Sequence, residues 1–135
     1  YQARIAGAAI AARALGGSAP DMRPWGAHAA TADHAAVPQV VFTDPEAASV
    51  GLTLAQAEQA GHRVRAVDVD LSTVAGAGLY ADGYRGRARM VVDLEDEIVR
   101  GVTFVGPGVG EMIHSATVAV VGRVPVGRLW HAVPS

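Results

Sequence analysis

The chain has 135 residues, half of them hydrophobic and 18% charged, a composition typical of one globular domain with a real core. Its net charge of −2 excludes the basic surface of a nucleic-acid-binding protein, and no apolar run approaches the ~20 residues that cross a membrane. The absence of cysteine excludes disulfides, thiolate metal sites and thiol redox chemistry within these residues. We therefore expect a cytoplasmic protein that binds neither nucleic acid nor membrane.

The first segment is rich in alanine, the best helix former, and predicts a helix over residues 1–15 that stops at Gly16 and Gly17. Residues 16–37 contain glycine, proline, serine and aspartate without a clear period, which predicts a linker. His28 and His34 lie in this linker. A metal site needs three or four convergent ligands, so two loop histidines without cysteine favour exposed positions instead.

The stretch of residues 38–51 starts as a strand, because residues 40–42 form a short apolar run of β-formers after a proline. The strand is expected to break at Asp44-Pro45, since proline disfavours helix at the residue before it. Thr53 and Gln56 then have the spacing of a capping box, which predicts a helix over residues 53–60.

Residues 62–71 predict a strand whose alternation slips, which indicates either a bulge or a strand covered on both faces. Residues 72–84 predict a glycine-rich connection. The clearest hairpin signal follows, with strands over residues 87–94 and 98–105 around an acidic turn at residues 95–97. One face of the first strand is expected to be buried (Ala88, Met90, Val92 and Leu94) and the other largely polar (Arg87, Arg89, Val91 and Asp93).

Residues 108–122 predict a helix, and residues 126–130 a short further helix. The longer helix carries one apolar stripe of Met112, Ile113, Ala116, Ala119 and Val120. Val118 and Val121 are apolar on its other faces, and a helix that is apolar on several sides is expected to be buried on several sides. This pattern suits a helix that lies between its own sheet and a partner.

The stretch of residues 38–51 resembles the opening of the C-terminal dimerisation domain of FAD-dependent pyridine nucleotide–disulfide oxidoreductases. That family includes dihydrolipoamide dehydrogenase, glutathione reductase and mercuric reductase. Its opening reads Pro-x-apolar-apolar-apolar-Thr-x-Pro-Glu-x-Ala-x-Val-Gly, and every specified position is matched here. The resemblance implies an α+β fold, with a mainly antiparallel sheet and helices packed on one face.

The resemblance also implies a division of the chain and a role for it. Residues 1–16 resemble the helix that ends the upstream FAD domain, residues 17–36 are the linker, and residues 37–135 are the dimerisation domain, truncated at its C-terminus. The chain is thus expected to be a fragment whose partners are a second copy and the upstream FAD and NAD(P) domains. Those domains hold FAD and NAD(P) in the parent protein, so the fragment is expected to hold neither and to be inert alone.

Residues 130–135 resemble the family signature His-x-His-Pro-Thr/Ser. In the family the histidine directly before the proline is the catalytic base, but Val133 stands there in this chain and cannot move a proton. His131 matches the first histidine and is the remaining candidate for the base. Two alternatives stay open: His131 packs near the interface, or the parent oxidoreductase has lost thiol chemistry.

The glycines from Gly106 to Gly110 follow a predicted strand and precede a helix, as in a nucleotide-binding loop. The third glycine of that fingerprint would fall at Glu111, whose carboxylate repels a pyrophosphate, so a strand-to-helix turn is favoured over a small-molecule or nucleotide-binding module. Glu111 and His114 have the spacing of half a di-iron site, but the sequence lacks a second half. No metal site is expected.

Overall fold

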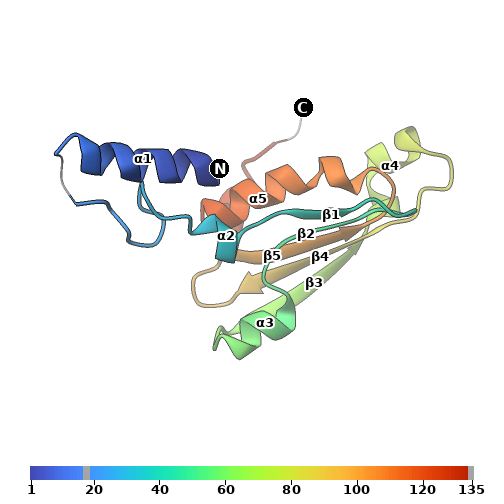
Figure 1. Cartoon of the computed structure of the whole chain (residues 1–135). Coiled ribbons are helices and arrows are strands. Elements are labelled where there is room, and N and C mark those ends of the chain that lie inside the picture. Colours follow the sequence, from blue (N-terminus) through green and yellow to red (C-terminus); the bar gives the residue numbers. More distant parts are fainter. Residues whose placement is uncertain (17–18, 134–135) are drawn as a thin grey trace. The chain divides into compact units, whose positions relative to one another are not determined.

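A computed structural model describes residues 1–16 and 19–133 and divides the chain into two compact units, Tyr1–Ala36 and Val37–Ser135 (Figure 1). Gly17, part of the predicted helix stop, lies outside the described residues, as do Pro134 and Ser135 of the C-terminal signature. None of the described helices is both long enough and apolar enough to cross a membrane.

The first unit contains helix α1 (Gln2–Ala14), as the alanine-rich sequence predicts, and none of its side chains is buried. α1 ends just before Gly16, whose φ of +66° suits glycine. The predicted linker is more ordered than its composition indicates, because it contains the short helix α2 (Ala32–Ala35). The N–H of Trp25 donates to Oγ1 of Thr31 (2.7 Å) within this unit.

The second unit is built on a five-stranded antiparallel sheet in the order β1-β2-β5-β4-β3. The strands are β1 (Gln39–Val41), β2 (Ala47–Gly51), β3 (Val64–Asp70), β4 (Arg87–Asp93) and β5 (Val99–Val105). The helices are α3 (Leu54–Gln59), α4 (Ala75–Tyr80), α5 (Ile113–Val121) and α6 (Val126–Leu129). The predicted α+β class, the antiparallel sheet and the hairpin of β4 and β5 are confirmed.

The capping box predicted for α3 is present. The N–H of Thr53 donates to Oε1 of Gln56 (2.9 Å), and the N–H of Gln56 donates to Oγ1 of Thr53 (3.3 Å). Such a cap contributes roughly 1 kcal/mol to helix stability. The local sequence therefore determines where this helix begins.

Two elements were not expected from the sequence. The chain turns at Asp44-Pro45, a cis peptide, and continues as β2, which pairs with both β1 and β5. Small residues dominate β2, so it lacks the β-branched run that marked β1. Helix α4 was read as a connection because Gly76 and Gly78 have low helix propensity.

The predicted faces of β4 are wrong near its turn. Val91 and Asp93 are only 2% and 3% exposed, whereas Leu94 is 44% exposed. Successive side chains of a strand point to opposite faces, and Val91 shares a groove with Thr53 and Leu54 at the start of α3. The face of β4 that the sequence indicates as polar is therefore buried at Val91 and Asp93, near the hairpin turn. A register shift between Val91 and Val92 adds a local irregularity to the pairing with β5.

The slipped alternation of β3 reflects neither a bulge nor cover on both faces, so that prediction is wrong. β3 pairs with β4 in unbroken register from Val64 to Asp70. Val67 and Val69 are 44% and 47% exposed, because β3 is an edge strand of the sheet. The charged residues of β3, Arg65, Asp68 and Asp70, suit an edge that remains unpaired.

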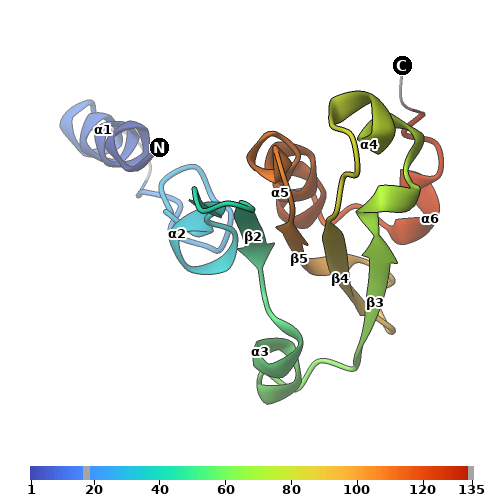
Figure 2. The ribbon, with the colours of Figure 1, turned by 90° about the vertical axis from the view of Figure 1, so that its right-hand side faces the viewer.

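The core lies between α5 and the sheet. Figure 1 shows α5 running along the sheet, and its contacts are with β2 and β5. α6 also faces this side, where Val126 and Leu129 line a cleft with Val67 and Val69; Figure 2 shows the two helices beside the strands. The buried residues of this region include Ala48, Val50, Val99, Val102, Val109, Ile113, Ala116 and Ala119. Val118 and Val121 remain exposed, so the single chain covers α5 on one side only, and cover by a partner stays a prediction.

A close backbone contact at Gly101 predicts a sensitive position. Gly101 of β5 pairs with Gly51, and a Cβ on Gly101 would overlap the carbonyl oxygen of Leu52. We expect Gly101→Ala to destabilise the chain by about 1–3 kcal/mol, the usual cost of overpacking, in urea unfolding. Gly76→Ala in α4 is the control, because its Cβ meets nothing within 4 Å. Equal free energies of unfolding for the two variants would contradict this account of the β2–β5 contact.

Candidate functional site

Residues 106–110 lead from the end of β5 into the 3₁₀ turn Val109–Glu111 that precedes α5. Gly108 has a φ of +69°, and a Cβ there would overlap the hydroxyl of Tyr80. The N–H of Gly110 donates to Oε2 of Glu46 (3.0 Å), and the N–H of Gly106 donates to the carbonyl of Glu46 (2.9 Å). The carboxylate of Glu46 therefore occupies the place where a nucleotide phosphate would meet the N–H of Gly110, and the backbone carbonyl of Glu46 already accepts the N–H of Gly106.

The structure does not bring the candidate metal ligands together. Glu111 and His114 are both exposed at the start of α5. The imidazole Nδ1 of His28 accepts a hydrogen bond from the N–H of Asp21 (2.8 Å), which gives this side chain a local structural role. Among residues 1–16 and 19–133, no cluster of three or more His, Cys, Asp or Glu side chains could hold a metal ion.

His131 lies in the turn after α6 and is exposed. Its N–H donates to the carbonyl of Arg128 (3.0 Å), so the backbone continues the turn of the helix. The neighbouring Trp130 and Val133 are 84% and 80% exposed. Over the described residues, the imidazole of His131 has no carboxylate within hydrogen-bond distance that would orient it as a base. The imidazole of His131 therefore lies in solvent, and none of the other described side chains pairs with it for acid–base chemistry.

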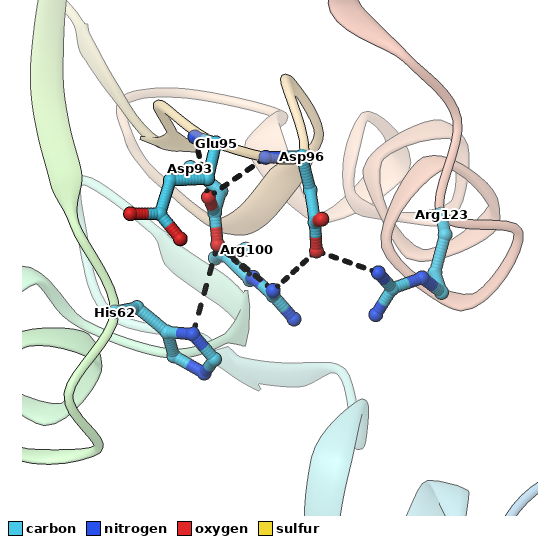
Figure 3. A network of polar contacts seen from close by, with 6 residues as sticks. All are labelled: His62, Asp93, Glu95, Asp96, Arg100 and Arg123. Carbon is cyan, nitrogen blue, oxygen red and sulfur yellow. Dashed lines mark hydrogen bonds and ion pairs between the residues drawn. The ribbon is translucent and has the colours of Figure 1, made fainter.

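The most buried charge of the described residues is Asp93, at the end of β4 (Figure 3). Its Oδ1 accepts from the N–H groups of Glu95 (2.9 Å) and Asp96 (3.1 Å) in the hairpin turn. Its Oδ2 accepts from Nε of Arg100 (2.8 Å), and Nδ1 of His62 lies 3.6 Å away. Sequence reasoning missed this site, although an Asp just before a tight turn commonly accepts from the N–H two residues on.

Asp96 extends this cluster to the segment after α5. One carboxylate oxygen of Asp96 accepts from Nη2 of Arg100 (2.9 Å) and from Nη2 of Arg123 (2.7 Å). The N–H of Val126 donates to the carbonyl of Glu97 (2.7 Å) beside it. The hairpin turn is thereby fastened to the chain between α5 and α6. Each buried charge is paired, so the cluster fits a structural clamp rather than a reactive site.

The electrostatics of the clamp follow from its hydrogen bonds. The backbone N–H groups of Asp96 and Glu95, together with the Arg100 guanidinium, hold the pKa of Asp93 at about 2, below the ordinary 3.8. Burial opposes this effect by raising the pKa of the carboxyl group, but the hydrogen bonds to the charged form prevail. Asp93 therefore remains a carboxylate at any pH near neutrality.

The second unit also presents two apolar hollows. One, of about 300 Å³, lies between α4 and the loop before α5 and is lined by Val74, Tyr80, Tyr84 and Met112 among others. The rings of Tyr80 and Tyr84 meet edge to face, and the Tyr84 hydroxyl donates to the carbonyl of Pro107 (3.0 Å). The other, of about 410 Å³, is the cleft between the sheet and α5 and α6. Neither contains a converging set of polar groups.

A family model described as "Pyridine nucleotide-disulphide oxidoreductase, dimerisation domain" matches residues 37–135. Dihydrolipoyl dehydrogenase of Thermus scotoductus is 42% identical over 84 residues, which cover 62% of this chain and 18% of that protein. Mercuric reductase of Acidithiobacillus ferrooxidans is 33% identical over 129 residues, which cover 96% of this chain and 21% of that protein. The chain thus spans about a fifth of the length of these relatives.

Solved structures share the fold. The HOCl-induced flavoprotein disulfide reductase RclA from Escherichia coli matches with a TM-score of 0.72 and 22% identity, over 95% of this chain and 27% of that one. LpdA from Mycobacterium tuberculosis matches with a TM-score of 0.70 and 25% identity, over 93% of this chain and 25% of that one. The five-stranded antiparallel sheet and its helices are therefore an arrangement shared with these two structures.

The clamp predicts a pH-dependent loss of stability. We expect Asp93→Asn to destabilise the chain by about 1–3 kcal/mol at pH 7, because hydrogen bonds to a buried carboxylate are weakened. The folded pKa of about 2 is below the unfolded value, so the contribution of Asp93 is present above about pH 4 and is lost as the pH falls towards 2. Urea unfolding of both proteins from pH 7 to pH 2.5 measures this, and the difference should shrink below about pH 4.

Asp82→Asn, at an exposed position, is the matched control, and its free energy of unfolding should stay close to that of the wild type. A difference between wild type and Asp93→Asn that stays constant down to pH 2.5 would contradict the role of the Asp93 carboxylate.

Proposed function

Because the chain belongs to the family of pyridine nucleotide-disulphide oxidoreductase dimerisation domains, we propose that residues 37–135 join two copies of a larger oxidoreductase into a homodimer. The observation that carries this proposal is the family match over the whole second unit, with the antiparallel sheet of a disulfide reductase. A two-fold dimer is the commonest assembly of identical chains, and it needs only one self-complementary surface.

The parent protein, in this proposal, is a cytoplasmic FAD-dependent, NAD(P)H-linked enzyme. Hydride passes from the nicotinamide to the flavin and then to a disulfide or another acceptor. The matched residues cover only about a fifth of these oxidoreductases, which supports a location of the FAD and NAD(P) sites in other domains. Residues 1–16 would then be the last helix of the upstream FAD domain, and residues 17–36 the linker to the dimerisation domain.

The residues present here do not fit a nucleotide cofactor. Glu46 already accepts the N–H of Gly110, and Glu111 follows directly, so two carboxylates stand where a pyrophosphate needs positive potential. A nucleotide-binding role for the loop from Gly106 to Gly110 is the second candidate function, and this local charge opposes it. We assign no catalytic step to a cofactor within this chain.

His131 is our candidate for a surviving acid–base group of the parent enzyme. Its exposed imidazole would have to meet the thiols and the orienting carboxylate in another part of the dimer. Val133 cannot serve in that role, so a parent that keeps the fold and has lost thiol chemistry is the alternative. A Cys-x-x-x-x-Cys pair in the upstream domain would favour the first possibility, and its absence the second.

The homodimer proposal predicts a concentration-dependent mass. Light scattering after gel filtration should give twice the mass of 13.8 kDa for the 135-residue chain, with dissociation only on dilution. A mass of one chain at every concentration up to the millimolar range would overturn homodimerisation by these residues.

The chain alone is expected to be inert towards nucleotides. Titration with FAD, NADH or NADPH in a calorimeter should release no binding heat, because the N–H groups of the glycine loop already face Glu46. The same mixtures should show no reductase turnover with disulfide acceptors. Glu46→Gln, which removes one charge at this position, is the matched variant. Binding heat from the wild type that grows in Glu46→Gln would favour the nucleotide-binding alternative.

A further inference from the structure

The apolar hollow between α4 and the loop before α5 is a cavity of about 300 Å³ that opens to solvent. Its inner end is closed, because Leu71 and Ala77 are only 6% and 8% exposed. Val74 and Met112 line its outer part, where they are 50% and 39% exposed. Small-molecule sites are typically concave, mostly apolar and of at least this volume.

Two tyrosines form one wall of this hollow, and the loop holds them in place. The hydroxyl of Tyr84 donates to the carbonyl of Pro107, and the ring of Tyr80 meets that of Tyr84 edge to face, with the ring centroids 6.0 Å apart. The hydroxyl of Tyr80 lies against Gly108, whose φ of +69° favours glycine. The wall is therefore ordered before a ligand enters, which lowers the entropic cost of binding.

The electrostatic potential of the hollow is negative. Among the described residues that line it, Glu111 is the one charged side chain; it is exposed and forms no ion pair with another described residue. Burial raises the pKa of the Tyr84 phenol, and Tyr80 and the carboxylate of Glu46 add to this effect. Glu46 therefore also acts on the hollow from behind the tyrosines. A cation would meet a carboxylate here without competition from a basic side chain of the lining.

These contacts define the chemistry of a ligand. An apolar body gains free energy by leaving water for the apolar lining, and an ammonium group at the mouth can donate to the carboxylate of Glu111. Tyrosine rings also attract an ammonium group that lies within about 6 Å of the ring face. A carboxylic acid or a phosphate ester would bring negative charge towards Glu111, and an apolar molecule without charge would leave that carboxylate unpaired.

We propose that the hollow between α4 and the loop before α5 binds a small apolar amine, whose ammonium group pairs with Glu111 while its hydrocarbon body lies against Tyr80 and Met112. This inference goes beyond the proposed homodimerisation and does not rest on it, because the residues that line the hollow all belong to one chain.

Three probes of similar size separate the charge of the ligand from its apolar contact: 2-phenylethylammonium, 2-phenylethanol and 3-phenylpropanoate. The amide signals of Ala77 and Gly108 in the nitrogen-15 NMR spectrum of the chain report binding. We expect a Kd on the order of 1 mM for the cation, as for other ligands of this size, and weaker binding of the alcohol and the anion. Added salt should weaken the binding of the cation alone. Equal affinities for the three probes, or no saturable shift with the cation, would overturn the proposal.

Glu111→Gln tests the carboxylate with little change in shape. It should weaken the binding of 2-phenylethylammonium about fivefold, the effect of losing one exposed ion pair, and leave the binding of 2-phenylethanol unchanged. Glu58→Gln is the matched control, because Glu58 is exposed in α3 and does not line the hollow. Both variants should keep the wild-type amide signals outside the hollow. An unchanged affinity of Glu111→Gln for the cation, or an equal loss for the cation and the alcohol, would contradict the proposed pairing.

Discussion

The buried carboxylate of Asp93 is the interaction on which the geometry of the second unit depends. It terminates β4, accepts two N–H groups of the hairpin turn and pairs with Arg100 of β5, so one side chain fixes both the turn and the register beside it. Asp96, which Asp93 holds in place, binds Arg123 beyond α5. Two aspartates and two arginines therefore connect the β4–β5 hairpin to the residues that follow α5 (Figure 3).

The opposite end of α5 is held by a second carboxylate. The carboxylate of Glu46, in the turn between β1 and β2, accepts a hydrogen bond from the N–H of Gly110, just before the helix. α5 is thus attached at its start to the β1–β2 turn and at its end to the β4–β5 turn, while small inner residues pack on β2 and β5. The position of α5 on the sheet is therefore set by contacts at both of its ends as well as by its packing.

Local signals in the sequence predicted what local physics controls. The capping box of Thr53 and Gln56, the hairpin of β4 and β5 and the glycines before α5 were all visible, since each depends on neighbours within a few residues. β2 and the buried face of β4 could not be predicted in this way, because the residues that pack against them come from distant segments of the chain. Asp93 reads as a surface residue until His62, about 30 residues earlier, and Arg100 are placed beside it. The family motif over residues 38–51 identified the domain where periodicity alone could not.

The folding of a single chain does not account for Val118 and Val121, which are apolar and remain exposed. Sequence periodicity required cover on several sides of α5, and the single chain supplies it on one side only. Isolated exposed valines need no explanation in a folded protein. A partner on this side of α5, as the proposed homodimer would provide, would supply the cover that the single chain lacks.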